Sequence, residues 1–399
     1  MGSMITLRLG RLEVDWGKNS FFRNHSPLFS KSDLGVADYF YADDQVIEQP
    51  AYVRKLRRVV GRLELLGYSL DGCKKAYATA LSHVPDYYPK VTIDFDVFRS
   101  ALCAVDLDRV RNDEYDADYD LGEFACYVLH DPEFNRVANS LSSGVTRDDG
   151  TFFENLDSYV TLRLLAENPA NLDRDLVWGI HDVVEGGYIE NTEVYEPLSD
   201  EGRFLIVTEG SSDSAILKAS LPGVAPDVSD FFDFVDMKDN YPFTGTGSLV
   251  NFCKGLAAIK VQNKIVIVLD NDTAGNAAFQ RLQSLKLPRN MRVIKLPYLE
   301  EFSRFATLGP SGNSMEDVNG RAVAIECFLD LNFGPDEVPA IRWTSYNHEC
   351  GAYQGELALK DVYTKRFFEG INQGNYNLAK LSLLWGHILQ VCASEASAI

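Results

Sequence analysis

The sequence predicts an α/β protein in which a C-terminal, Rossmann-like parallel sheet with flanking helices follows a mainly α-helical N-terminal part. Two short apolar runs, Phe204–Thr208 and Ile265–Leu269, carry the prediction of the sheet. Neither run alternates polar with apolar residues, which is typical of strands buried on both faces. A helix-start signal follows each run, Ser211 or Ser212 after the first and Thr273 after the second.

Acidic side chains follow both predicted strands. Glu209 comes directly after the first, Asp270 and Asp272 come after the second, and Asp213 lies one turn into the first helix. Open α/β sheets place their ligand sites at the carboxyl ends of the strands. Carboxylates gathered there repel one another unless a cation lies between them, and a hard divalent ion with oxygen ligands is the usual solution. Gly275 would let the backbone pass close to such a site.

A simpler interpretation is that Glu209 and the two aspartates only cap helices and favour the helix N-termini electrostatically. Acidic turns between a strand and a helix are common, so one such turn alone would favour capping. Here two turns occur in one alternating array, with the sequence GTGSLVNF between them. This combination favours a functional site.

The combination resembles the Toprim domain that is shared by topoisomerases, primases and the nucleases of the overcoming-lysogenization-defect class. The signature of that domain is a glutamate after the first strand and an Asp-x-Asp motif after a later one, here Glu209 and Asp270-Asn271-Asp272. The EGSSD form, with Asp213 four residues after the glutamate, looks more like the nuclease branch. The resemblance implies phosphodiester chemistry that depends on Mg²⁺ or Mn²⁺.

The resemblance also implies further site residues. In nucleases of the Toprim class a second group of acids completes a two-metal site, for which Asp317 and Glu326 are the candidates, close to a helix expected over Arg321–Leu331. Helix capping by Asp317 and a solvated Glu326 would explain these acids equally well. A lysine late in the chain assists catalysis in related nucleases, and Lys360 is the candidate, although base rates favour a surface lysine of an amphipathic helix.

The expected activity is metal-dependent hydrolysis of phosphodiester bonds in nucleic acid, either DNA or tRNA. Two ions bridged by Asp270 would orient the scissile phosphate and activate a water molecule. Glu209 would be a ligand or general base, and Asp272 and Asp213 would be ligands. The competing interpretation is a non-catalytic regulatory or scaffold subunit that binds a partner ATPase, and the intact carboxylates at every signature position argue against it.

The N-terminal sequence MITLRLGRLEVDWGKN resembles the module that precedes HEPN or Toprim effector domains in bacterial conflict systems. That resemblance covers roughly the first sixty residues and implies an anti-phage defence effector that works beside a separate ATPase or sensor. We expect residues 1–187 to form this mostly helical domain and residues 188–202 to be a linker. Residues 203–333 would then be the Toprim domain, and residues 334–399 an extension packed on the core.

Hydrophobic periodicity predicts the other elements of the fold. Half-buried and buried strands are expected at Met4–Asp15 and Met291–Pro297, and helices at Tyr52–Leu66, Ser69–His83, Asp96–Val105, Glu123–His130, Leu156–Glu167 and Leu378–Val391. One face of the Tyr52–Leu66 segment is basic. That face could be an ordinary solvated surface or a surface that binds phosphate.

The charge balance is unusual for a protein that is expected to hold a polyanion. The chain of 399 residues has 38 basic and 58 acidic residues, which give a formal net charge of −20. We therefore expect weak intrinsic affinity for nucleic acid and a partner that supplies a basic surface. The acidic segment Asp106–Glu123 would be a contact for that partner or an exposed solubilising loop. Self-association into a homo-oligomer is left open.

Seven scattered cysteines without a CxxC motif are typical of reduced thiols in a cytosolic protein. No run of about 18 apolar residues occurs, and the N-terminus lacks the apolar core of a signal peptide. These features favour a cytoplasmic protein that does not associate with membranes.

Overall fold

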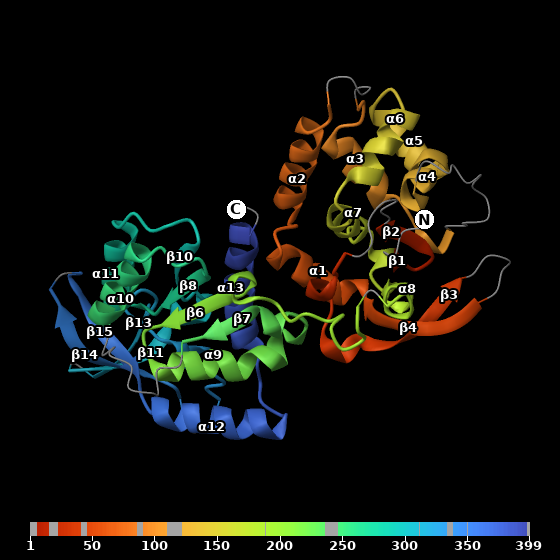
Figure 1. Ribbon diagram of the computed structural model, residues 1–399. Coiled ribbons are helices and arrows are strands. Elements are labelled where there is room, and N and C mark those ends of the chain that lie inside the picture. The colour runs from red at the N-terminus through yellow and green to blue at the C-terminus, as the bar shows by residue number, and fades with distance from the viewer. Residues whose placement is uncertain are drawn as a thin grey trace. The chain divides into compact units, whose positions relative to one another are not determined.

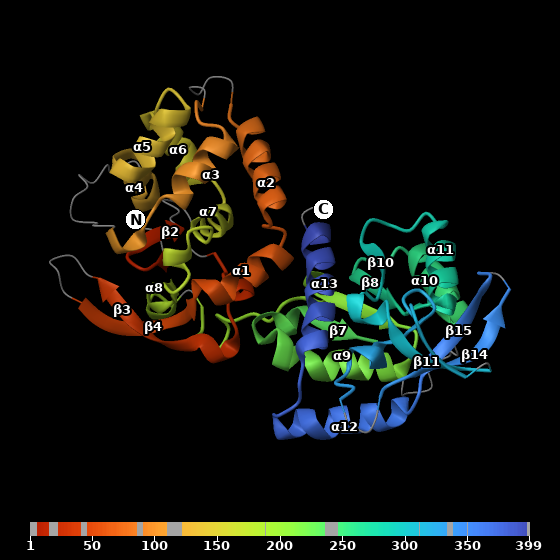
Figure 2. The ribbon, with the colours of Figure 1, turned by 180° about the vertical axis from the view of Figure 1, so that it is seen from behind.

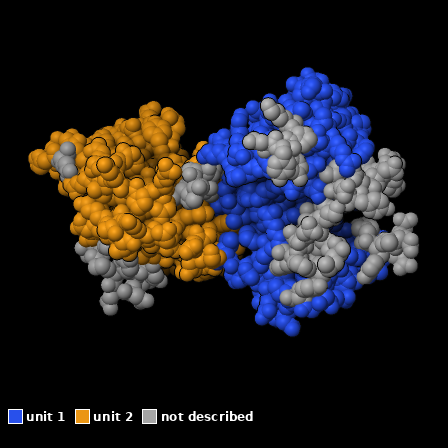
Figure 3. Space-filling model, turned by 45° about the horizontal axis from the view of Figure 1, so that its top comes forward, with its two compact units in different colours: residues 1–198, 396–398 blue, residues 199–395, 399 orange. Residues whose placement is uncertain are grey.

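The computed structural model describes residues 6–15, 23–40, 46–85, 91–109, 122–187, 189–235, 246–310, 312–332, 338–348 and 350–396. The fold is mixed α/β, and the chain divides into two compact units, shown in Figure 1 and coloured separately in Figure 3. Unit 1 comprises residues 1–198 with 396–398, and unit 2 comprises residues 199–395 with 399. The division falls within the linker predicted at residues 188–202.

Unit 1 contains a five-stranded antiparallel sheet in the order β2-β1-β5-β4-β3. Its strands are β1 (Thr6–Leu9), β2 (Leu12–Asp15), β3 (Leu34–Phe40), β4 (Val46–Lys55) and β5 (Asp175–Gly179). The strand predicted over Met4–Asp15 is a hairpin, because Gly10 turns the chain with a φ of 62°. β5 lies between β1 and β4, so the sheet joins the beginning and the end of unit 1.

Helices account for most of the remaining regular structure of unit 1. They are α1 (Leu56–Leu65), α2 (Leu70–Ser82), α3 (Phe95–Cys103), α4 (Glu123–His130), α5 (Pro132–Leu141), α6 (Arg147–Asn155), α7 (Ser158–Leu165) and α8 (His181–Glu185). Figure 1 shows α2 to α7 gathered on the same side of β3 and β4. The helices expected at 69–83, 96–105, 123–130 and 156–167 are confirmed, with ends that agree to within two residues.

The helix expected over Tyr52–Leu66 is wrong in its first part. β4 continues to Lys55, and α1 begins only at Leu56. The residues from Tyr52 to Lys55 pair with β5. These cross-strand contacts outweigh the helical periodicity of the isolated segment, since the preference for strand depends on the tertiary surroundings.

Two of the basic residues of this segment, Arg54 and Arg62, are buried and cannot belong to a surface for phosphate. Arg54 is only 3% exposed, and its guanidinium lies 3.1 Å from the Asp33 carboxylate. The buried Arg62 donates its Nε–H to the carbonyl oxygen of Pro27 at 2.7 Å. Lys55 faces Asp175 at 2.9 Å. Both buried arginines therefore hold unit 1 together.

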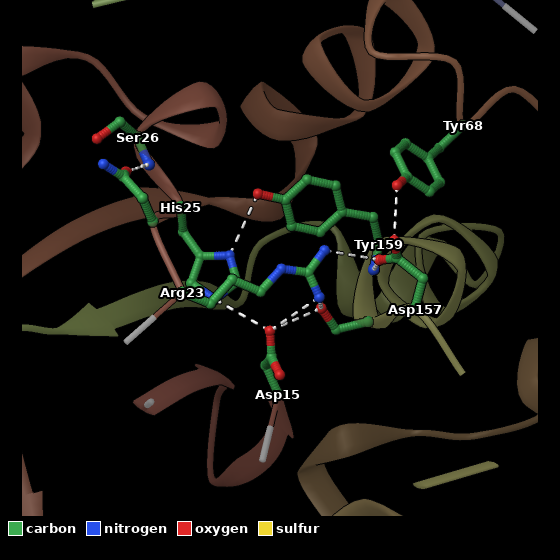
Figure 4. A network of polar contacts seen from close by, with 9 residues as sticks. Asp15, Arg23, His25, Ser26, Tyr68, Asp157 and Tyr159 are labelled. Atoms are coloured by element: carbon green, nitrogen blue, oxygen red, sulfur yellow. Dashed lines mark hydrogen bonds and ion pairs between the residues drawn. The ribbon is translucent and has the colours of Figure 1, made fainter. Parts of the chain in front are cut away.

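A polar network links β2 with the start of α7 (Figure 4). The ring of His25 is fully buried, with Nδ1 3.2 Å from the Tyr159 hydroxyl and Nε2 3.1 Å from Asp15 Oδ2. Arg23 donates to Asp15 at 3.2 Å and to Asp157 at 3.0 Å. Burial lowers the pKa of His25 despite the neighbouring Asp15. A neutral imidazole with its proton on Nε2 accepts from the Tyr159 hydroxyl and faces the carboxylate with an N–H group.

Unit 2 is built on a four-stranded parallel sheet in the order β10-β8-β6-β7. The strands are β6 (Phe204–Thr208), β7 (Phe232–Phe234), β8 (Lys264–Leu269) and β10 (Met291–Lys295). The strands predicted at 204–208, 265–269 and 291–297 are confirmed. After β6 the chain first adds β7 on one side and then returns to add β8 on the other. The neighbouring strands β6 and β8 thus form a topological switch point, where open α/β sheets place their ligand crevice.

Helices cover both faces of this sheet. They are α9 (Ser211–Val224), α10 (Thr246–Ala258), α11 (Thr273–Gln283) and α13 (Ala379–Ala396), while α12 (Lys360–Gln373) packs on α9. Val207 and Ile267 belong to the core that the sheet forms with α10 and α11. On the other face, the buried Trp385 of α13 contacts the Phe232 ring at 5.2 Å and donates to Ser220 of α9 at 3.0 Å. Figure 2 shows α13 running beside β7.

A second sheet of unit 2 has the order β12-β11-β14-β15. Its strands are β11 (Phe305–Gly309), β12 (Gly312–Glu316), β14 (Ile341–Asn347) and β15 (Ala352–Leu357). The helix expected over Arg321–Leu331 is wrong. That segment forms β13 (Ala322–Val323), which pairs with β9 (Asn271–Asp272), and then a 3₁₀ helix, Ile325–Phe328. The pairing satisfies backbone groups of the Asp-x-Asp segment, which a helix would leave without these partners.

No helix in the described ranges is long and apolar enough to cross a membrane. All seven cysteines lie in those ranges, and none forms a disulfide bond.

Candidate active site

Five carboxylates lie around the carboxyl ends of β6 and β8. Glu209 follows β6, and its Oε1 accepts the backbone N–H of Asp270, the residue after β8, at 3.2 Å. Asp213 comes from the first turn of α9, and Asp272 precedes α11. Glu326 comes from the 3₁₀ helix, and its charge acts on Asp213 and Asp270. The switch point therefore brings Glu209 to the Asp-x-Asp segment.

Asp272 is the N-cap of α11. Its Oδ1 accepts the backbone N–H of Gly275 at 2.7 Å, so the cap is Asp272 and not the expected Thr273. Gly275 also allows a close approach of the backbone, because a Cβ there would lie 2.2 Å from the carbonyl oxygen of Asp270. The capping interpretation thus holds for one oxygen of Asp272.

Asp213 is held in a similar way at the start of α9. The N-cap position belongs to Gly210 and not to Ser211 or Ser212. The backbone N–H of Gly210 donates to Asp213 Oδ2 at 2.9 Å, and the Ser212 hydroxyl donates to Asp213 Oδ1 at 3.2 Å. The carboxylate is therefore fixed in orientation at the positive end of the helix dipole.

A residue from the C-terminal extension binds the second oxygen of Asp272. Gln354 of β15 donates from Nε2 to Asp272 Oδ2, and its Oε1 accepts the backbone N–H of Ala274 at 3.1 Å. The Thr273 hydroxyl donates to the carbonyl oxygen of Tyr353 at 3.1 Å. Sequence reasoning missed Gln354, because it lies 82 residues after Asp272 in a segment without a recognisable motif.

Burial and mutual repulsion oppose ionisation throughout this group. Burial, together with the charge of Asp272, raises the pKa of Glu209 to about 8. Burial and the charge of Glu326 raise the pKa of Asp213 to about 7. Burial and the neighbouring acids raise the pKa of Asp270 well above its ordinary value, and burial also raises that of Asp272. A cation among these groups would favour their ionised forms.

Lys360 lies near the acidic group. It is the first residue of α12, after Leu359 in the left-handed conformation with a φ of 60°. Its Nζ lies 3.6 Å from Glu356 Oε2, and its charge opposes the rise in the pKa of Asp213. Its side chain is about half exposed, with a fractional exposure of 48%.

The structure does not bring Asp317 to the group. This residue is exposed in the loop after β12, where its Oδ1 accepts the backbone N–H and the side-chain amide of Asn319, each at 3.0 Å. The β11–β12 hairpin and this local turn keep it in the outer loop. Of the two acids expected to hold a second ion, Glu326 alone is close to the others.

The donor atoms suit a hard divalent cation, because all five side chains offer carboxylate oxygens. Their positions do not form a ready chelate. Among the residues that the structure describes, no group of three or more His, Cys, Asp or Glu side chains is arranged to hold a metal ion. Repulsion between neighbouring carboxylates favours such separated positions when no cation is present. Shared coordination therefore requires rotation of these side chains.

Comparison with known families concerns mainly unit 1. The family model described as HEPN/Toprim N-terminal domain 1 matches residues 1–201. The chain belongs to this family. The resemblance noted in the first sixty or so residues is thus confirmed and extends to the end of unit 1. No curated protein and no solved structure matches the chain.

The matched residues of this HEPN/Toprim N-terminal domain protein end before β6. The name of the family links the chain to Toprim proteins. The match does not cover the parallel sheet of unit 2 or its acids Glu209, Asp270 and Asp272, for which the resemblance to the Toprim domain stays a prediction from the sequence.

Proposed function

We propose that unit 2 hydrolyses phosphodiester bonds of nucleic acid, DNA or tRNA, with Mg²⁺ or Mn²⁺ held by its carboxylates. The observation that carries the proposal is the convergence of Glu209, Asp213, Asp270, Asp272 and Glu326 at the switch point of a parallel sheet. A cluster of acids with raised pKa values in a ligand crevice is typical of catalytic sites.

The residues of the chain have distinct parts in this proposal. A divalent ion in such a site supplies Lewis acidity toward the phosphate and lowers the pKa of a bound water. Asp270 is the central ligand, because the charges of the other four acids all act on it. Glu209, which accepts the backbone N–H of Asp270, is a ligand or general base. Lys360 would stabilise negative charge that develops on the phosphate.

The test is cleavage of plasmid, linear DNA and tRNA by the purified chain with Mg²⁺, with Mn²⁺ and with EDTA. Asp270→Asn should abolish metal-dependent cleavage while the protein remains folded. Asp200→Asn is the matched control, because Asp200 is an exposed aspartate of unit 2 whose carboxylate has no hydrogen bond or ion pair with any residue that the structure describes. Full cleavage by Asp270→Asn would refute the proposed role of the cluster.

One observation favours a second candidate function. The lack of a ready three-residue chelate among the described side chains fits a non-catalytic subunit that keeps the fold and binds a partner ATPase. That candidate predicts no cleavage under any metal condition, together with stable association with an ATPase on purification from a native host. Cleavage that is lost in Asp270→Asn would exclude it.

We further propose that the protein acts in the cytoplasm as an effector of prokaryotic anti-phage defence, beside a separate ATPase or sensor. Membership of the HEPN/Toprim N-terminal domain family supports this role. The net charge of −20 supports a partner with a basic surface. The acidic segment Asp106–Glu123 is the proposed contact, and most of it, residues 110–121, lies outside the described residues.

A further inference from the structure

A cavity of about 620 Å³, open to solvent, lies at Asn271 in unit 2. Its walls come from β10 and the residues that follow it, from α11, from the loop at residues 317–320 and from α13. The lining side chains used below are Asn271, Phe279, Lys295, Tyr298 and His387. Asn271 stands between Asp270 and Asp272 in the chain, but none of the five carboxylates of the cluster lines the cavity, and the one acid in its wall is Asp317.

Two polar side chains of the wall make no hydrogen bond with any described residue. The first is the amide of Asn271, a residue with only 7% of its surface exposed. The second is the imidazole of His387, which is half-buried. Most of Asn271 is buried, but its amide atoms still reach solvent at the cavity wall. An amide that borders a cavity under these conditions is suited to binding a ligand.

The same cavity offers an aromatic ring and a cation. Tyr298 is 56% exposed at the rim, and its hydroxyl lies 3.4 Å from Glu300. Lys295 donates to Asn276 Oδ1 at 2.5 Å, and its ammonium group lies 5.2 Å from the centre of the Phe279 ring. An exposed ring beside a cation and an unpartnered amide matches the contacts that single-stranded nucleic acids make, since bases stack on aromatic rings and phosphates face cations.

We propose that this cavity binds one unpaired nucleotide of the nucleic-acid substrate. The base lies against Tyr298 within reach of the Asn271 amide, and the phosphate faces Lys295 and His387. The proposal rests on the proposed function and adds that the substrate is single-stranded next to the cleaved bond. A base in a duplex is stacked and paired, and it must leave the helix before it can enter such a cavity.

The experiment measures binding without metal, so that it does not depend on the carboxylates. Fluorescence anisotropy with a labelled single-stranded DNA and a single-stranded RNA of about 10 nucleotides, and with the matching duplexes, is recorded in EDTA. Ionic strength is kept at about 50 mM, because the chain is acidic. Single strands should bind more tightly than the duplexes.

Three variants locate the site. Tyr298→Ala removes an exposed ring without disturbing the core and should weaken single-strand binding by roughly 5- to 100-fold. Asn271→Ala should weaken it by roughly 3- to 10-fold, the effect of lost hydrogen bonds. Tyr346→Ala is the matched control, since Tyr346 is 45% exposed on β14 outside the cavity, and it should leave binding unchanged.

Absence of single-strand binding by the unaltered protein, equal or tighter binding of duplex, or unchanged binding by Tyr298→Ala would each overturn the proposal. The same holds if Tyr346→Ala loses as much affinity as Tyr298→Ala. Failure of the proposed function looks different, because single strands would then bind at the cavity while no metal supports cleavage. If Asp270→Asn abolishes cleavage but Tyr298→Ala alters neither binding nor turnover, only the assignment of the cavity fails.

Discussion

Replacing Glu209 with glutamine should stabilise the metal-free protein at alkaline pH. The pKa of this carboxyl group is about 8 in the folded protein, against an ordinary value of 4.5 that applies to the unfolded chain. Between these two values the unfolded chain is ionised and the folded protein holds a proton. Stability therefore falls as pH rises from about 4.5 toward 8, because folding takes up a proton over that range. Glutamine keeps the shape and the acceptor for Asp270 but cannot ionise.

The magnitude follows from the same two values. One pKa unit corresponds to about 1.4 kcal/mol, so the full effect of Glu209 above pH 8 is at most about 5 kcal/mol. The raised pKa of Glu209 already includes repulsion from the Asp213 carboxylate, so the effects of these two groups on the free energy of unfolding cannot be added in full. One kcal/mol shifts the midpoint of thermal unfolding by about 2–4 °C in a domain of this size. We expect Glu209→Gln to raise the midpoint of unit 2 by several degrees.

Differential scanning calorimetry in EDTA, at about pH 5 and about pH 9, measures this difference. The variant and the unaltered protein should unfold at similar temperatures at the lower pH and separate at the higher one. Glu369→Gln is the control, because Glu369 is exposed on α12 and its ion pair with Lys365, at 3.9 Å, contributes little. Added Mn²⁺ should stabilise the unaltered protein more than the variant. If both proteins lose the same stability between the two pH values, the repulsion inferred for the cluster is absent.

Four further predictions follow from the same structure. Gln354→Met should weaken Mn²⁺ binding by about 10- to 100-fold in calorimetric titration. Gln280→Met, the same change at an exposed position of α11, should leave Mn²⁺ binding unchanged. Equal affinities of the two variants would show that the Gln354 amide does not orient Asp272. Lys360→Met should lower kcat for cleavage with little change in KM, and unaltered turnover would remove Lys360 from the site. Burial lowers the pKa of His25, so unit 1 should lose stability as pH falls below 6.5 toward that lowered value, and calorimetry of His25→Gln should show a weaker dependence on pH. The isolated chain should digest nucleic acid slowly at about 150 mM salt, where the screening length is about 8 Å; rapid digestion without a partner would contradict the argument from charge.

Local sequence patterns were sufficient to predict the central strands of unit 2 and the acids that follow them. The apolar runs of β6 and β8 lack alternation because both faces of their sheet are covered, so their positions and the acids at their ends could be predicted. The capping residues were less predictable. Serine, threonine and aspartate all suit the N-cap position, and the choice of Asp272 over Thr273 depends on the path of the backbone out of β8.

Contacts between distant segments could not be predicted in this way. The pairing of β13 with β9 replaces a helix that the isolated segment favours, and it places Glu326 near the cluster while Asp317 stays outside. Gln354 and His387 belong to β15 and α13, which reach the site through packing in unit 2. Single-sequence periodicity describes the buried face of an element but not the partner that covers it.

The distance along the chain between the parts of the acidic cluster affects the order in which a ribosome can assemble it. The contact between Glu209 and Asp270 joins residues 61 apart, and that between Asp272 and Gln354 joins residues 82 apart. A nascent chain that has just exposed β10 already carries both signature motifs, yet Gln354 and Lys360 have still to be synthesised. Translation that stops early in β15 would release a polypeptide with every signature acid and without the amide that holds Asp272. The cluster is thus completed late in synthesis, when unit 1 has already emerged.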